Sequence, residues 1–151
     1  MRWSRGASTV DGALADGRLE RVSGGAADGS ALLRSAWALL SSAQRELDQN
    51  PEAAYVLAYD AARKASTALL AQQGLRPRST GHHVTVEHVV RAQFGGAFDE
   101  FGMLRRRRAA IEYPQHPGDD VDAAEAAEAF AAATRITDAA DQLVPELSLY
   151  T

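Results

Sequence analysis

The chain has 151 residues, of which 46% are hydrophobic and 24% are charged, a balance typical of one globular domain. Its formal net charge of −4 excludes a general basic field for nucleic acid, so any such contact must be local. The absence of cysteine excludes disulfides and thiolate metal sites, and we expect a cytoplasmic protein without a cofactor. No apolar run approaches the roughly 20 residues of a membrane helix, and we expect no secretory signal at the N-terminus.

The first segment, residues 1–29, contains Gly, Ser, Asp and Ala with only isolated Leu, Val and Trp. Such a segment offers too little apolar surface to order itself, so we predict a flexible N-terminal arm. Residues 30–145 are then predicted to form the domain, with residues 146–151 as a C-terminal tail.

Two long helices are predicted next, over residues 30–49 and 51–73. The apolar residues of the first recur at helical spacing after a serine N-cap and are Leu33, Ala36, Trp37, Leu40, Ala43 and Leu47. Asn50 and Pro51 separate the two helices, because Asn caps well and Pro is tolerated at the first helical position. Gly74 supplies the left-handed residue that ends the second helix. The two helices should therefore form an antiparallel hairpin.

The segment 74–81 contains two Gly, one Pro and two Arg, so it is predicted to be a loop. His82 and His83 follow it and open a short segment rich in valine, which ends at a Gly-Gly pair. We predict a short helix here, although four valines between residues 84 and 90 also fit a strand.

A fourth helix is predicted over residues 97–113 and contains the arginine run Arg105–Arg108. The last long helix should start at Asp119 or Asp120, whose carboxylates suit a helix N-terminus, and end near Gln142. Its alanine-rich face fits packing within the chain and close contact between two copies equally well. The fold predicted from these elements is all-α: a four- to five-helix up-down bundle with a short extra helix.

The arginine run is the segment best suited to chemistry. Successive helical residues turn by about 100°, so the four arginines cannot all face water. The apolar line of this helix passes through Arg108, and a half-buried arginine needs a carboxylate partner. Glu112 lies one turn further on the same face. We predict a stripe of Arg105, Arg108 and Glu112 that is either a structural ion pair or a functional site.

The order of a helical hairpin, a loop, a short segment and the sequence LRRRRAAIEYP before a final helix resembles the HEPN superfamily over about residues 30–143. Members share a four- or five-helix bundle, and many are metal-independent RNases, frequently toxins paired with a nucleotidyltransferase-type antitoxin. Their signature is an Arg, a polar residue that is usually Asn, and a His a few residues later. The resemblance places Arg107 or Arg108 at the Arg position and Glu112 at the His position, with Tyr113 beside it. A subset of the superfamily carries an acidic residue followed by Tyr at this place.

The resemblance implies a homodimer and a metal-independent endoribonuclease in a toxin–antitoxin or defence setting, with a nucleotidyltransferase-type partner. The lack of a long apolar run predicts no membrane association. The catalytic candidates are Arg107 and Arg108, which would stabilise charge on the phosphate, and Glu112, which would take the 2′-hydroxyl proton. The proton of the leaving oxygen would come from His116 or, across a dimer, from one of the paired histidines. The candidate binding residues are Arg105, Arg106, Tyr113, His82, His83 and His116.

Alternatives to the RNase stay open. The missing His favours a non-catalytic HEPN module that binds a protein partner, a nucleotide or RNA, and a dimeric scaffold is a third class. The paired histidines also fit a solvated loop, and four His without Cys predict no metal site. Arg76 and Arg78 are either solvated charges or an extension of a phosphate-binding patch. The aromatic residues Trp37, Tyr55 and Tyr59 fit the core or an interface better than base stacking.

Overall fold

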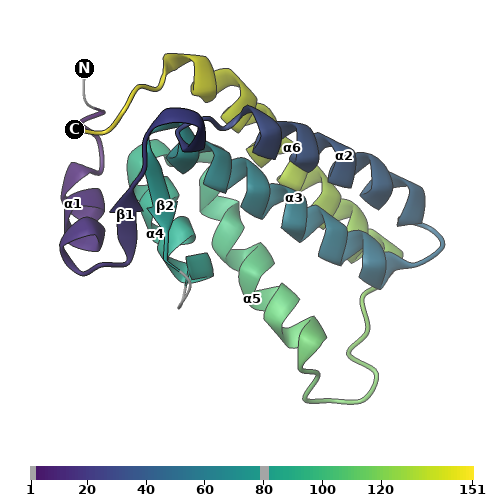
Figure 1. The fold of residues 1–151 in the computed structure, drawn as a ribbon. Coiled ribbons are helices and arrows are strands. Elements are labelled where there is room, and N and C mark those ends of the chain that lie inside the picture. Colours follow the sequence, from purple (N-terminus) through teal and green to yellow (C-terminus); the bar gives the residue numbers. More distant parts are fainter. Residues whose placement is uncertain (1–2, 79–81) are drawn as a thin grey trace.

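The computed structural model describes residues 3–78 and 82–151, which form six α-helices and two short strands (Figure 1). The helices are α1 (Ala7–Ala15), α2 (Ser30–Glu46), α3 (Pro51–Gln72), α4 (His82–Phe94), α5 (Phe101–Glu112) and α6 (Ala123–Leu143). The strands are β1 (Leu19–Arg21) and β2 (Leu75–Pro77), and three short 3₁₀ helices are η1 (Gly24–Ala26), η2 (Gly96–Glu100) and η3 (Val144–Glu146). The predicted helical bundle is confirmed. Among these helices, none is long and apolar enough to cross a membrane.

Helix α3 begins and ends where its local sequence predicts. The side chain of Asn50 accepts a hydrogen bond from the backbone N–H of Ala53 at 3.1 Å, which satisfies a donor of the first turn. After the last turn, Gly74 has a φ of 69°, a left-handed conformation that glycine adopts without strain. The predicted hairpin is confirmed, because α2 and α3 pack against each other on either side of the break at Asn50.

Helix α6 begins later than Asp119 or Asp120, the predicted starting positions. Asp122 caps it instead, because its side chain accepts from the backbone N–H of Glu125 at 2.8 Å. The valine-rich segment before η2 is helical, as predicted, and becomes α4. Residues predicted to start the fourth helix form η2, so the α-helix proper begins at Phe101.

The core lies where α2, α3 and α6 run side by side (Figure 1). Its small residues let the helix axes approach closely and include Ala54, Ala58, Ala61, Ala62, Ala65, Ala126, Ala129, Ala132 and Ala133. This face of α6 therefore packs within the chain. Tyr55 and Tyr59 are each only 3% exposed, which confirms them as core residues. Trp37 differs from the other residues of the apolar face predicted for this helix, because it is 36% exposed.

The N-terminal segment differs from the flexible arm predicted over residues 1–29. Within the described residues 3–29, α1 packs against α4 and buries Val10 and Ala13 completely. The indole Nε1 of Trp3 donates to the backbone carbonyl of Gln93 at 3.1 Å. The few apolar residues of this segment gain their burial from a distant helix, which their own spacing does not reveal.

The predicted loop over residues 74–81 contains β2, and its residues 79–81 lie outside the described part of the chain. β2 pairs antiparallel with β1, and Glu20 lies opposite Arg76 in the register. The two side chains form an ion pair with an N–O distance of 2.6 Å, and Arg78 lies 3.5 Å from the same carboxylate. Arg76 and Arg78 thus both contact the carboxylate of Glu20 in β1.

The C-terminal residues 146–151 pack on the fold instead of forming a separate tail. Tyr150 is 3% exposed, its hydroxyl donates to the Asp11 carboxylate at 3.0 Å, and its backbone N–H donates to the Gln73 carbonyl at 2.9 Å. The C-terminal residues therefore lie beside α1 (Figure 1).

Candidate functional site

The four arginines of α5 point in different directions, as the helical turn requires, and they meet different partners. Arg105 faces α4, where its Nε donates to the Glu87 carboxylate at 2.6 Å. Glu87 also accepts from Arg91, one turn further along α4, at 3.1 Å. The Glu87 side chain is only 3% exposed, so this is a buried carboxylate held between two arginines.

Burial by itself raises the pKa of Glu87. The hydrogen bond and charge of Arg105, followed by those of Arg91, outweigh burial and leave the pKa of Glu87 below its ordinary value. The carboxyl is therefore ionised at neutral pH, and α4 and α5 are joined by a charged pair.

Arg107 turns to the opposite side of α5 and binds the start of α6. Its Nε donates to Glu125 at 2.9 Å, and its Nη1 donates to Asp119 at 3.2 Å. Burial lowers the pKa of Arg107, but the two carboxylates outweigh that effect and raise the pKa above its ordinary value. Arg106 is exposed and forms no ion pair with any residue in the described ranges.

Arg108 and Glu112 form the predicted pair, with an N–O distance of 3.2 Å across one turn of α5. The pair lies at the surface, because the Glu112 side chain is 53% exposed and that of Arg108 is 25% exposed. Arg108 makes one hydrogen bond to the described chain, and its Nε is buried without an acceptor there. The protein thus uses only part of the donor capacity of Arg108.

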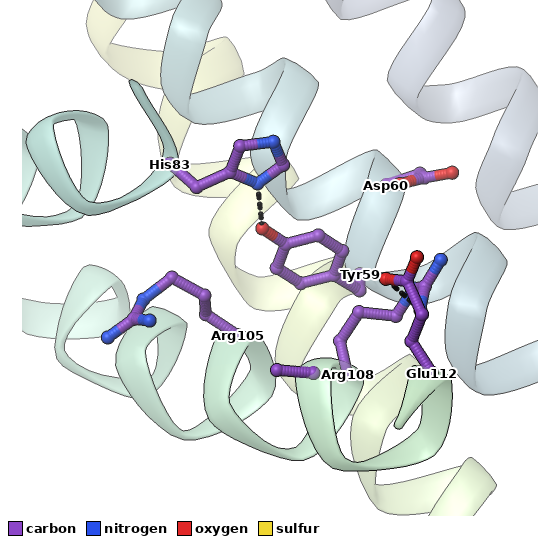
Figure 2. Close-up of a pocket in the computed structure, with 7 residues that line it drawn as sticks. Tyr59, Asp60, His83, Arg105, Arg108 and Glu112 are labelled. Carbon is purple, nitrogen blue, oxygen red and sulfur yellow. Dashed lines mark hydrogen bonds and ion pairs between the residues drawn. The ribbon is translucent and has the colours of Figure 1, made fainter. Parts of the chain in front are cut away.

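A cavity of about 260 Å³ opens between α3, α4 and α5 (Figure 2). Tyr59 and Asp60 come from α3 and His83 from the first turn of α4, and the lining residues are Tyr59, Asp60, His83, Arg105, Arg108, Ala109 and Glu112. Below we call it the Arg108 pocket. Its formal charges balance if His83 is neutral, because two arginines face two carboxylates.

The aromatic side of the Arg108 pocket is a contact between Tyr59 and His83. The Tyr59 hydroxyl lies 2.5 Å from Nδ1 of His83, and the two rings are nearly parallel, with their centroids 6.0 Å apart. Burial is the main reason that the pKa of Tyr59 is raised to about 12. The phenol is therefore protonated at neutral pH and holds the imidazole at the pocket wall (Figure 2).

The structure brings some of the predicted site residues together and separates others. Arg105, Arg108, Glu112 and His83 share the Arg108 pocket. Arg107 is on the α6 side of α5, and Arg106 is exposed. Tyr113 and His116 line a separate hollow beyond the end of α5, and the side chain of His82 lies outside the described part of the structure.

Three residues of this region were not predicted as site residues: Tyr59, Asp60 and Glu87. Tyr59 is predicted for the core or an interface, and Asp60 carries no local signal. Glu87 does carry a local sequence signal: a carboxylate within the apolar sequence VTVEHVV needs a polar partner when the helix is buried. Its position four residues after His83 places both on one face of α4.

The Arg108 pocket can bind and orient an anion and exchange protons with it. Its arginines are donors suited to phosphate, and its imidazole and carboxylates are the groups that transfer protons most readily near neutral pH. Within the described residues, no three His, Asp or Glu side chains are grouped to hold a metal ion.

Comparisons of the chain with protein-family models, with curated proteins and with solved structures found no match.

Proposed function

We propose that the protein is a HEPN-like, metal-independent endoribonuclease that cleaves single-stranded RNA at the Arg108 pocket. One observation carries the proposal: an imidazole from α4 lines the same small cavity as a carboxylate and two arginines from α5. Cleavage without a metal needs a base, an acid and a fixed cation, and these residue types supply all three. The His that the motif lacks has a counterpart in His83 of α4.

In the proposed reaction the 2′-hydroxyl oxygen attacks the adjacent phosphorus and the bond from phosphorus to the 5′-oxygen breaks. The products are a 2′,3′-cyclic phosphate and a 5′-hydroxyl. Glu112 takes the 2′-hydroxyl proton, and His83 gives a proton to the leaving 5′-oxygen. Arg108 and Arg105 donate to the phosphate oxygens, where negative charge grows in the transition state.

The exposure of Glu112 supports its assigned role. A phosphate that binds Arg108 displaces Glu112 from the guanidinium, and a surface pair of this kind resists displacement by only about 0.3–0.5 kcal/mol. The displaced carboxylate remains on the same turn of α5, next to the reacting phosphate. Binding of the phosphate to Arg108 thus also frees the Glu112 carboxylate to act as the base.

The test is incubation of the purified protein with a defined single-stranded RNA in EDTA, with detection of 2′,3′-cyclic phosphate ends. Arg108→Ala should lower the cleavage rate by about a hundredfold or more. Arg135→Ala is the matched control, because it also removes one arginine from an ion pair, with Glu100 at 2.7 Å, away from the pocket. Equal activity in the two variants, or a wild-type protein that leaves RNA intact, would refute the proposal.

A non-catalytic binding module is the second candidate, and the charge balance of the pocket favours it. Arg105 and Arg108 are each paired with a carboxylate, so the protein has already satisfied part of the charge that a transition state would need. This function predicts saturable binding of RNA or a nucleotide without cleavage, and its loss in Arg105→Ala.

In the HEPN setting we propose a toxin or defence protein that acts as a homodimer with a nucleotidyltransferase-type partner. Met103 of α5 and Tyr113, the residue after its end, support a dimer contact here, because they are 53% and 72% exposed. Sedimentation at high micromolar concentration should give a dimer that Met103→Glu weakens. A wild-type monomer under these conditions would contradict the dimer without affecting the pocket.

A further inference from the structure

Glu87 is the one buried carboxylate beside the Arg108 pocket within the described residues, and it lies outside the motif of α5. It uses its two oxygens for different arginines. Oε1 accepts from Nε of Arg105 at 2.6 Å, and Oε2 accepts from Nη1 of Arg91 at 3.1 Å. A buried carboxylate with a hydrogen bond on each oxygen has little freedom to move, so it restricts the movement of the Arg105 guanidinium that it binds.

The bond to Nε leaves the rest of the Arg105 guanidinium unused. Neither Nη nitrogen of Arg105 donates to a described residue, so the two terminal amino groups remain for a ligand. Two parallel N–H groups are the arrangement that arginine uses to bind phosphate. Glu87 therefore binds Nε of the Arg105 guanidinium and does not compete with a ligand for its two Nη groups.

Gly102 makes room for this carboxylate. It lies inside α5, where glycine is a poor helix former, and its backbone has ordinary helical φ. A Cβ atom at this position would lie closer to Oε2 of Glu87 than non-bonded atoms approach. The absence of a side chain is thus explained by the carboxylate that packs against it.

We propose that Glu87 is a positioning residue that holds Arg105 for phosphate binding in the Arg108 pocket, with Gly102 as the gap that admits it. The proposal rests on the proposed RNA-binding role of that pocket. A free arginine loses much rotamer freedom when it binds a ligand, and a side chain that is already held loses less. Glu87 acts through Arg105 alone and does not touch the RNA.

Two variants test this by different means. Glu87→Gln keeps the shape of the side chain and removes its charge, whereas Gly102→Ala leaves all charges in place and pushes the carboxylate away. Glu100→Gln is the control, because it makes the same charge change in an ion pair with Arg135, and neither of these residues lines the pocket. Far-UV circular dichroism establishes that each variant is folded.

The binding measurement uses fluorescence anisotropy with a labelled single-stranded oligouridylate at fixed salt. Both Glu87→Gln and Gly102→Ala should bind about tenfold more weakly than wild type, and Glu100→Gln should bind like wild type. The positioning measurement uses the Arg105 Nε–H signal in NMR spectra, assigned with Arg105→Lys. This signal should be protected from exchange with water in the wild type and exchange faster in both variants.

The result that would overturn the proposal is an Arg105 signal that neither variant changes, or affinities in both variants equal to that of Glu100→Gln. A purely structural role for Glu87 would lower stability and leave the affinity of the folded protein for the oligonucleotide unchanged. A wild type that binds the oligonucleotide without cleaving it would refute the nuclease function alone. Failure of the positioning role of Glu87 can therefore be distinguished from failure of the nuclease function.

Discussion

The two glutamates that bind arginines of α5 should differ in their contribution to stability, and Glu112→Gln should change stability very little. Glu112 is 53% exposed and lies 3.2 Å from Arg108 across one helical turn. Solvent screens such a pair, which contributes only about 0.3–0.5 kcal/mol to the free energy of unfolding. A loss of about 3–5 kcal/mol would be expected only if the pair were buried.

Glu87→Gln should destabilise the protein several times more. Its side chain is 3% exposed, and both oxygens accept hydrogen bonds from arginines. The glutamine retains one acceptor but turns an amide N–H₂ towards the second arginine. Because Arg105 and Arg91 are 26% and 42% exposed, water compensates part of the loss, and we expect about 1–3 kcal/mol.

Urea denaturation followed by far-UV circular dichroism measures both losses under one set of conditions. The two variants have the same net charge, so a general charge effect cancels in their comparison. Equal denaturant slopes would show that the unfolded states are comparable. The reasoning would be refuted if Glu112→Gln lost as much stability as Glu87→Gln, because burial would then not govern the strength of these pairs.

Three further predictions concern pH, catalysis and the N-terminal segment. The pKa of Glu87 is lowered in the folded protein from its ordinary value of 4.5, so its stabilisation is complete above that pH and is lost as pH falls through the lowered pKa. Acid titration of wild type and Glu87→Gln should therefore converge below pH 4.5, and parallel curves would contradict this assignment. Glu112→Gln should bind RNA more tightly, since a competing charge is gone, yet cleave it about a hundredfold more slowly; a fully active variant would remove Glu112 from the mechanism. Deletion of residues 1–21 should lower the free energy of unfolding by about 3 kcal/mol or more, from the burial of Val10 and Leu19 at roughly 1.5–3 kcal/mol each. An unchanged melting temperature would show that this segment does not support the fold.

Much of the fold could be predicted because its signals are local. Asn50 caps α3 through the backbone three residues away, and Gly74 ends the same helix through its own φ angle. The alanine-rich face recognised in the last predicted helix is the face of α6 that buries alanine. Each of these features depends on residues within one or two turns of each other, so the sequence alone contains the necessary information.

The ends of the chain could not be predicted in this way. Val10 and Leu19 are too few to form a periodic face, and they become buried only against α4 and the pairing of β1 with β2. The N-cap residue of α6 could not be predicted from the sequence either. Several aspartates precede that helix, and the turn before it decides that Asp122 is the cap.

In the candidate site, too, contacts within one helix were predictable and contacts between helices were not. The Arg108–Glu112 pair was predictable because residues four apart on a helix are neighbours in any α-helix. The contacts that give the pocket its shape join separate helices: Tyr59 of α3 meets His83 of α4, and Glu87 of α4 meets Arg105 of α5. Periodicity specifies which face of a helix is apolar, but not which helix will cover it. Only the packing of α3, α4 and α5 decided that the imidazole and the arginines would share one cavity.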